Sequence, residues 1–189
     1  MTPFGHLAGG FLAGRTLINR LQMPAEERGT LLAHGALGGV LPDLDTLIHL
    51  FRTRSIEFGE DFQHHRWLTH TFPFYWIPAI LVWLYARVSG RPRLARKAVV
   101  TVGGTSAHLL QDTIGAGDGI MLFWPFTRRV FGIFSLGVHG RHWLDAYRKH
   151  PVFWIERMIR GAGLGFAILE AINWFRRSRR KKWISLGKG

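Results

Sequence analysis

The sequence contains no cysteine. Disulfide bonds and thiolate metal sites are therefore excluded, and any bound metal ion must be held by nitrogen and oxygen atoms. The first residues, MTPFGHLAGGFLAG, also lack the basic segment with which a cleavable signal peptide begins. We therefore expect this stretch to belong to the fold.

Acidic residues are scarce, with 12 Asp and Glu against 25 Lys and Arg, and the formal net charge is +13. The basic residues gather in separate blocks, above all at 87–97 and 176–182. No nucleic-acid recognition motif accompanies them, so we expect no nucleic-acid partner. Basic blocks beside apolar segments are typical of anchors that face anionic lipid headgroups, which we expect to bind the basic loops and the tail.

Formal charge is absent between Arg66 and Arg87, a stretch of about 20 residues, which is the length of helix that a bilayer core requires. Shorter uncharged runs lie at 29–42 and 98–111, each preceded by a proline that favours the first turn of a helix. A further helix begins at Pro151. A soluble all-α bundle would also fit the mean hydropathy of +0.06. The distribution of charge favours an all-α membrane bundle with about five membrane-inserted helices.

The direction of successive helices predicts where the polar clusters lie. If the basic blocks at 87–97 and 176–182 are cytoplasmic, the histidine and aspartate clusters all fall on the opposite, extracytoplasmic side. Further basic residues at 128–149 would lie on that side too. These residues depart from the positive-inside pattern that the other two blocks follow. Polar residues at such depth are functional candidates because burying them in a bilayer is costly.

Two short motifs contain paired candidate ligands. HLLQD, residues 108–112, places His108 and Asp112 four residues apart on one helical face, where both can bind the same ion or pair of ions. LPDLD, residues 41–45, places Asp43 and Asp45 just past a predicted helix end. These two carboxylates either point at one centre or cap a turn.

A third motif, HHRWLTH, spans residues 64–70. His65 and His70 converge if the chain bends near Trp67 and Thr69 caps the next helix. His64 is then an exposed neighbour. Arg66 offers a planar fork of donors for an anionic ester oxygen, or else extends to the lipid headgroups.

Together these residues predict a metal site at one membrane face. A set of more than four nitrogen and oxygen ligands, with carboxylates able to bridge, suits two or more ions of Zn, with Mn or Fe as alternatives. His6 joins this set, although a lone histidine is often a structural residue. The predicted metal ligands are His6, Asp43, Asp45, His65, His70, His108 and Asp112.

Three residues are candidates for catalysis. Asp45 or Glu156 would accept a proton, and Arg66 would bind the ester oxygen. Glu156 would alternatively pair with Arg157 or Arg160. The segment 115–137, rich in glycine and aromatic residues, is too broken to span a membrane. We expect it to form either a lid in the interface over the site or a surface hairpin.

The motifs MTPFGHLAGG, GGVLPDLD, HHRWLTHT, HLLQD and LFWPF resemble, in order and approximate spacing over residues 1 to 126, the YdjM-like family. That family is described as LexA-regulated, membrane-bound, predicted metal-dependent hydrolases. The resemblance implies a multi-pass inner-membrane protein in which the seven predicted ligands are the matched polar positions. The His-x3-Asp spacing of His108 and Asp112 is also loosely similar to a metal-binding motif of the zinc-dependent phospholipase C and single-strand nuclease group. The chain has no His-x3-Glu after residue 115, which leaves a third metal ion unsupported.

The sequence thus predicts a membrane-embedded metal-dependent hydrolase of the inner membrane. We expect residues 1–175 to form its single domain and 176–189 a basic cytoplasmic tail. The expected substrate is a phosphoester of a membrane lipid or polyprenyl carrier, because a site in the outer half of the bilayer faces lipid headgroups. The alternative is a metal-binding transporter or envelope sensor without turnover. A transporter would need a polar path from the site to the other face of the membrane, to which His34 could contribute.

Overall fold

The structure is a computed structural model that describes residues 1–189 except 55–64, 66, 116–118, 135, 137–141 and 187–189. Among the described residues, regular structure is helical, and the only paired extended segments form an isolated bridge between Ile120 and Phe131. This confirms the predicted all-α class. The helices are α1 (Pro3–Arg20), α2 (Arg28–Gly38), α3 (Leu44–Thr53), α4 (Phe72–Val88), α5 (Pro92–Ile114), α6 (Trp143–Lys149) and α7 (Pro151–Leu186).

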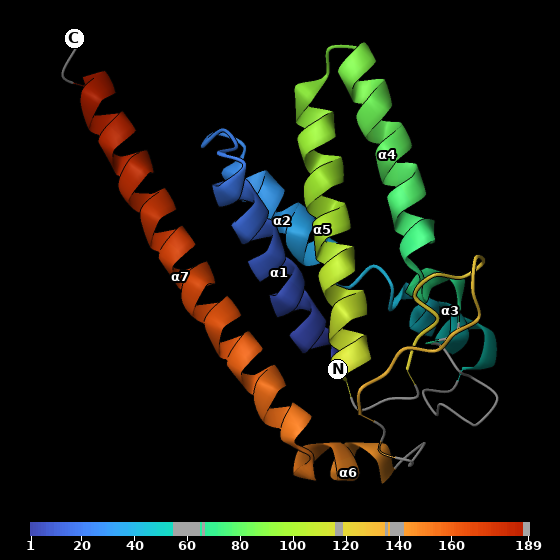
Figure 1. Cartoon of the computed structure of the whole chain (residues 1–189). Coiled ribbons are helices and arrows are strands. Elements are labelled where there is room, and N and C mark those ends of the chain that lie inside the picture. The colour runs from blue at the N-terminus through green and yellow to red at the C-terminus, as the bar shows by residue number, and fades with distance from the viewer. Residues whose placement is uncertain (55–64, 66, 116–118, 135, 137–141, 187–189) are drawn as a thin grey trace.

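Helices α1, α2 and α5 form the centre of the molecule, and their backbones touch (Figure 1). A Cβ atom added at Gly104 of α5 would lie 2.2 Å from the carbonyl oxygen of Gly35 in α2. One added at Gly35 would lie 2.8 Å from the Cα of Gly14 in α1. Only glycine fits at such distances, so these residues allow the three helices to approach closely.

An apolar cluster of Ile18, Leu31, Leu32 and Val100 holds the same helices together toward the α1–α2 connection. The candidate ligands lie toward the opposite end, near the start of α1 and the end of α5. The basic block at 87–97 surrounds the α4–α5 turn, far from the start of α1 in Figure 1. The predicted separation of the basic block from the histidine clusters is therefore present in the fold.

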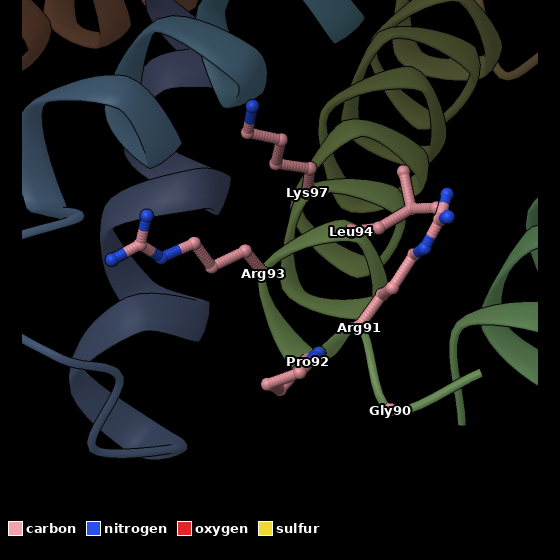
Figure 2. A pocket seen from close by; sticks show the side chains of 6 residues that line it. All are labelled: Gly90, Arg91, Pro92, Arg93, Leu94 and Lys97. Atoms are coloured by element: carbon pink, nitrogen blue, oxygen red, sulfur yellow. The ribbon is translucent and has the colours of Figure 1, made fainter. Parts of the chain in front are cut away.

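The α4–α5 turn borders an open basic depression of about 500 Å³. Figure 2 shows Arg93 and Lys97 extending toward the neighbouring blue helices, while Arg91 points to the other side. The residues that line it are Gly90, Arg91, Pro92, Arg93, Leu94 and Lys97.

Helix α4 packs along α5 (Figure 1). Apolar side chains are exposed around most of the circumference of α4. Only the small Ala86 is fully buried in it. The exposed large apolar residues of α4 are Phe74, Trp76, Ile77, Ile80, Leu81, Val82, Trp83, Leu84, Tyr85 and Val88.

The start of α4 corrects one expectation. The chain does bend near Trp67, because a 3₁₀ turn occupies Leu68–His70. The residue that precedes α4 is Thr71, however, and not Thr69. Thr69 does not cap the helix because its hydroxyl donates to Asp45 instead. Among the residues that the structure describes, no helix is both long and apolar enough to cross a membrane.

Helices α3 and α6 were not predicted, and the ends of the predicted helices shift by several residues. Helix α7 begins at Pro151, as expected, and packs against α1. It continues through Arg176, where the sequence suggested a boundary between domain and tail, to Leu186.

Candidate metal centre

Side chains from four parts of the chain meet beside the start of α1. His6 lies on α1, Asp43 directly precedes α3, and His65 and His70 precede α4. His108 and Asp112 lie on α5. Two groups of three have ligand atoms that all lie within 4.8 Å of one another: His6, Asp43 and His108 form the first, and His65, His70 and Asp112 the second.

Asp112 faces both groups. Its Oδ1 lies 3.1 Å from Nε2 of His6, and its Oδ2 lies 2.9 Å from Nε2 of His108. On the other side, Oδ2 lies 3.9 Å from Nε2 of His65 and 3.8 Å from Nε2 of His70. The amino group of Met1 also lies 3.0 Å from Oδ1. The Asp112 carboxylate thus lies between the two groups and faces histidines of both.

Asp43 is a second carboxylate between the groups. Its Oδ1 lies 3.6 Å from Nε2 of His108 and 3.9 Å from Nε2 of His70. The rings of His6 and His108 stack with centroids 3.7 Å apart. Two carboxylates that each face histidines of both groups are the arrangement expected of a site for two metal ions.

Asp45 lies outside both groups, behind His70. Its Oδ2 accepts a hydrogen bond of 2.8 Å from the Thr69 hydroxyl and lies 3.3 Å from Nδ1 of His70. Its Oδ1 accepts the backbone N–H of Thr46 at 2.7 Å. A carboxylate at the far nitrogen of a histidine fixes the tautomer and the orientation of a metal-binding ring. The predicted roles of Asp45 as ligand and base stay predictions, and the geometry adds this positioning role.

His108 is fixed in a comparable way by the backbone. Its Nδ1 lies 2.7 Å from the carbonyl oxygen of Gly39. Because a carbonyl oxygen only accepts, Nδ1 carries a proton, and Nε2, which faces Asp112, is the nitrogen left to bind a metal ion. Gly39 also has to be glycine, since a Cβ there would lie 2.2 Å from the carbonyl oxygen of His6.

Several buried atoms of the site have the properties of metal ligands. Nδ1 of His6 is buried and has no hydrogen-bond partner within the part of the chain that the structure describes, and the buried Nε2 of His108 and Oδ2 of Asp112 face each other at 2.9 Å. Buried polar atoms normally have a partner, and a divalent cation would provide one here. Removal from water lowers the pKa of His65 to about 3, although the charge of Asp112 opposes this shift. The ring is therefore neutral at pH 7, the form that binds metal ions.

Glu156 lies apart from both groups, between α1 and α6. Its buried carboxylate accepts hydrogen bonds from the backbone N–H of Thr2 at 3.0 Å, from the Thr2 hydroxyl and from the Tyr147 hydroxyl. Nη1 of Arg160 lies 3.7 Å from Oε1 of Glu156, so the ion pair with Arg160 that the sequence offered as an alternative is also present. These contacts hold the start of α1 against α7. A role of Glu156 as proton acceptor stays a prediction.

Arg66 and His64 lie outside the described residues. The structure adds Thr69 and the Gly39 carbonyl to the predicted set. Thr69 sits within the HHRWLTH motif and was interpreted as a helix cap. A backbone carbonyl such as that of Gly39 leaves no signal in the sequence.

In the part of the chain that the structure describes, fold and site together define a helical protein with a largely buried cluster of histidines and carboxylates that could hold metal ions. The chain matches the family model of the YdjM inner membrane protein over residues 1–182 and belongs to that family. The match confirms the resemblance and extends it well past residue 126. Comparison with curated proteins and with solved structures finds no match.

Proposed function

We propose that this chain is a membrane-embedded, metal-dependent hydrolase that cleaves a phosphoester of a membrane lipid or polyprenyl carrier. The main support is that two carboxylates, Asp112 and Asp43, lie between the two ligand groups and each face histidines of both. His6, Asp43 and His108 would hold one ion, and His65, His70 and Asp112 a second. The ligand set of nitrogen and oxygen atoms suits Zn, with Mn or Fe as alternatives.

The protein's own residues would prepare this centre. A pair of divalent cations, when bound, lowers the pKa of water to about 7 and stabilises negative charge on the leaving oxygen. Asp45 and Thr69 hold the ring of His70, and the Gly39 carbonyl holds that of His108. Asp45 or Glu156 would take the proton released from water, and Arg66 would bind an ester oxygen.

Embedding in the membrane is supported by the family and by α4. Family members are inner membrane proteins. A helix that is apolar around its whole circumference needs an apolar environment, and α4 exposes aromatic and aliphatic residues on most sides. With about five inserted helices and the basic α4–α5 turn in the cytoplasm, the ligand cluster would lie toward the extracytoplasmic face. Lipid headgroups are the phosphoesters nearest to such a site.

Metal analysis of the purified protein tests the site directly. We expect wild type to bind about two equivalents of Zn, and His108→Ala and Asp112→Ala to lose most of it, because each removes a proposed metal ligand. His34→Ala is the matched control, since His34 lies 3.2 Å from the Thr101 hydroxyl through Nδ1 and belongs to neither ligand group. Inductively coupled plasma mass spectrometry measures the content. Full occupancy in both ligand variants would disprove the site.

Phosphate release from vesicles of defined lipids tests the reaction. Wild type should release phosphate or a phosphorylated headgroup from at least one lipid, and the two ligand variants should not. Bound metal without turnover on any phosphoester would instead favour the transporter or envelope sensor.

A further inference from the structure

Helix α3 combines a site residue with an exposed apolar stripe. Leu44, Leu47, Ile48 and Phe51 are 45%, 48%, 49% and 80% exposed. They follow the spacing i, i+3, i+4, i+7, which places them on one face of a helix. Asp45, at a different angle around the same helix, is fully buried beside His70 of the candidate metal centre. The helix thus separates the centre from an apolar outer surface.

The length of α3 indicates how such a surface can be covered. A helix of 10 residues is about 15 Å long, half of what a bilayer core requires. A short helix with a strong apolar face and a polar opposite face is typical of one that lies in the plane of the membrane interface. Its last turn carries Arg52, and Arg54 follows, both exposed and able to reach headgroups.

The loop segment 119–134 lies at the same end of the molecule as α3 (Figure 1). Among its described residues, Phe126 is 78% and Ile133 67% exposed. Arg128 and Arg129 between them are exposed too. Exposed apolar residues interspersed with cations fit the acyl and headgroup layers of an anionic membrane better than the surface of another protein. The exposed apolar surface of α4 begins directly after the HHRWLTH motif, which contains His65 and His70.

We propose that α3 is an interfacial helix whose apolar stripe inserts into an anionic lipid surface, and that lipid headgroups reach the metal-ligand cluster past this helix. The first part stands without the hydrolase activity. The second part rests on the proposed function, and it defines the substrate as a lipid that enters sideways from the membrane and not a soluble ester.

Spin labels test the insertion. Because the chain has no cysteine, single variants need no other change. Leu47→Cys and Phe51→Cys place a nitroxide on the stripe, and Thr53→Cys is the control because Thr53 is exposed about half a turn away from Phe51. The full chain is reconstituted in vesicles of zwitterionic and anionic phospholipid.

We expect labels at 47 and 51 to collide with oxygen and to be shielded from a water-soluble nickel chelate. The label at 53 should show the opposite preference. Access of the chelate to 47 and 51 would overturn the proposal. Shielding of both positions from both reagents would overturn it as well, because the stripe would then be covered by protein, such as a second copy of the chain.

A second measurement tests lateral entry. Leu47→Glu and Phe51→Glu should lower hydrolysis of lipid in vesicles at least tenfold while metal content and hydrolysis of a soluble short-chain phosphoester stay at wild-type values. Thr53→Glu is the control. Equal activity of the variants on vesicles would overturn lateral entry. If wild type hydrolyses neither ester, the proposed function fails, and the spin-label result still decides the position of α3.

Discussion

Asp43 and Asp45 are two residues apart in the sequence and face different partners. Helix α3 begins between them, so Asp43 points at Nε2 of His70 while Asp45 lies at Nδ1 of the same ring. The two carboxylates hold opposite edges of one histidine. Only the ring nitrogen that faces Asp43 and Asp112 is placed to bind metal in this arrangement.

Asp45→Asn tests the positioning role of Asp45. It should weaken metal binding about 10- to 100-fold, because an amide oxygen holds the His70 ring less firmly than a carboxylate. Thr69→Val should have a smaller effect in the same direction, since it removes the hydroxyl that donates to Asp45. Competition with a fluorescent zinc chelator measures both affinities, and Thr53→Val, at an exposed position in the last turn of α3, serves as the control. A loss as complete as in Asp112→Ala would instead make Asp45 a ligand, and an unchanged affinity would contradict both roles.

Among the helices, contacts between backbones decide how the ligands meet. His6 on α1 and His108 on α5 stack because α1, α2 and α5 approach through glycines. Gly35 lies at the centre of these contacts, touching Gly14 on one side and approached by Gly104 on the other. The ligand cluster therefore depends on residues that have no side chain.

Gly35→Ala should destabilise the bundle by about 1–3 kcal/mol, the usual cost of forcing an added methyl group into a packed contact. Gly29→Ala is the matched control on the same helix, because nothing lies within 4 Å of a Cβ there. Alanine favours a helix over glycine by up to about 1 kcal/mol, so the control should be neutral or stabilising. Thermal unfolding in detergent, followed by circular dichroism, compares them. Equal effects of the two substitutions would contradict the close-packing explanation.

Over the whole molecule, α7 is attached to the central helices at separate points along α1. Near its start, Glu156 holds Thr2, and in its middle a Cβ at Gly163 would lie 2.9 Å from that of Ala8. Further along, Glu170 accepts hydrogen bonds from Arg15 at 3.2 Å and from Arg28 Nε at 2.7 Å. Most other α7 side chains that the structure describes, up to residue 179, are exposed.

Glu170→Gln should loosen α7 while the metal centre stays intact. The substitution leaves Arg15 and Arg28, both partly buried, without their carboxylate, at a cost of about 1–2 kcal/mol. Amide hydrogen exchange in the middle of α7 should become roughly tenfold faster, with unchanged zinc content. Glu26→Gln, at an exposed position before α2, is the control. Loss of zinc in Glu170→Gln would show instead that α7 supports the centre.

The sequence by itself was sufficient for the all-helical class and the family, and its seven predicted ligands include the six residues that lie together in the two groups. Helix starts such as Pro92 and Pro151 are local signals, because proline fits the first turn of a helix without losing a hydrogen bond. The spacing of His108 and Asp112 fixes that both lie on one helical face. These predictions need only neighbours along the chain.

The tertiary structure alone decided which atoms face one another. Thr69 was predicted as a helix cap, and it bonds Asp45 because the 3₁₀ turn and the start of α3 lie side by side. The apolar spacing of Leu44, Leu47, Ile48 and Phe51 is visible in the sequence, but only packing shows that this face of α3 points outward. Periodicity determines which residues share a face, while the partner of that face depends on helices far away in the sequence. The same holds for the metal centre, whose two groups of ligands exist only where α1, α5 and the segments before α3 and α4 converge.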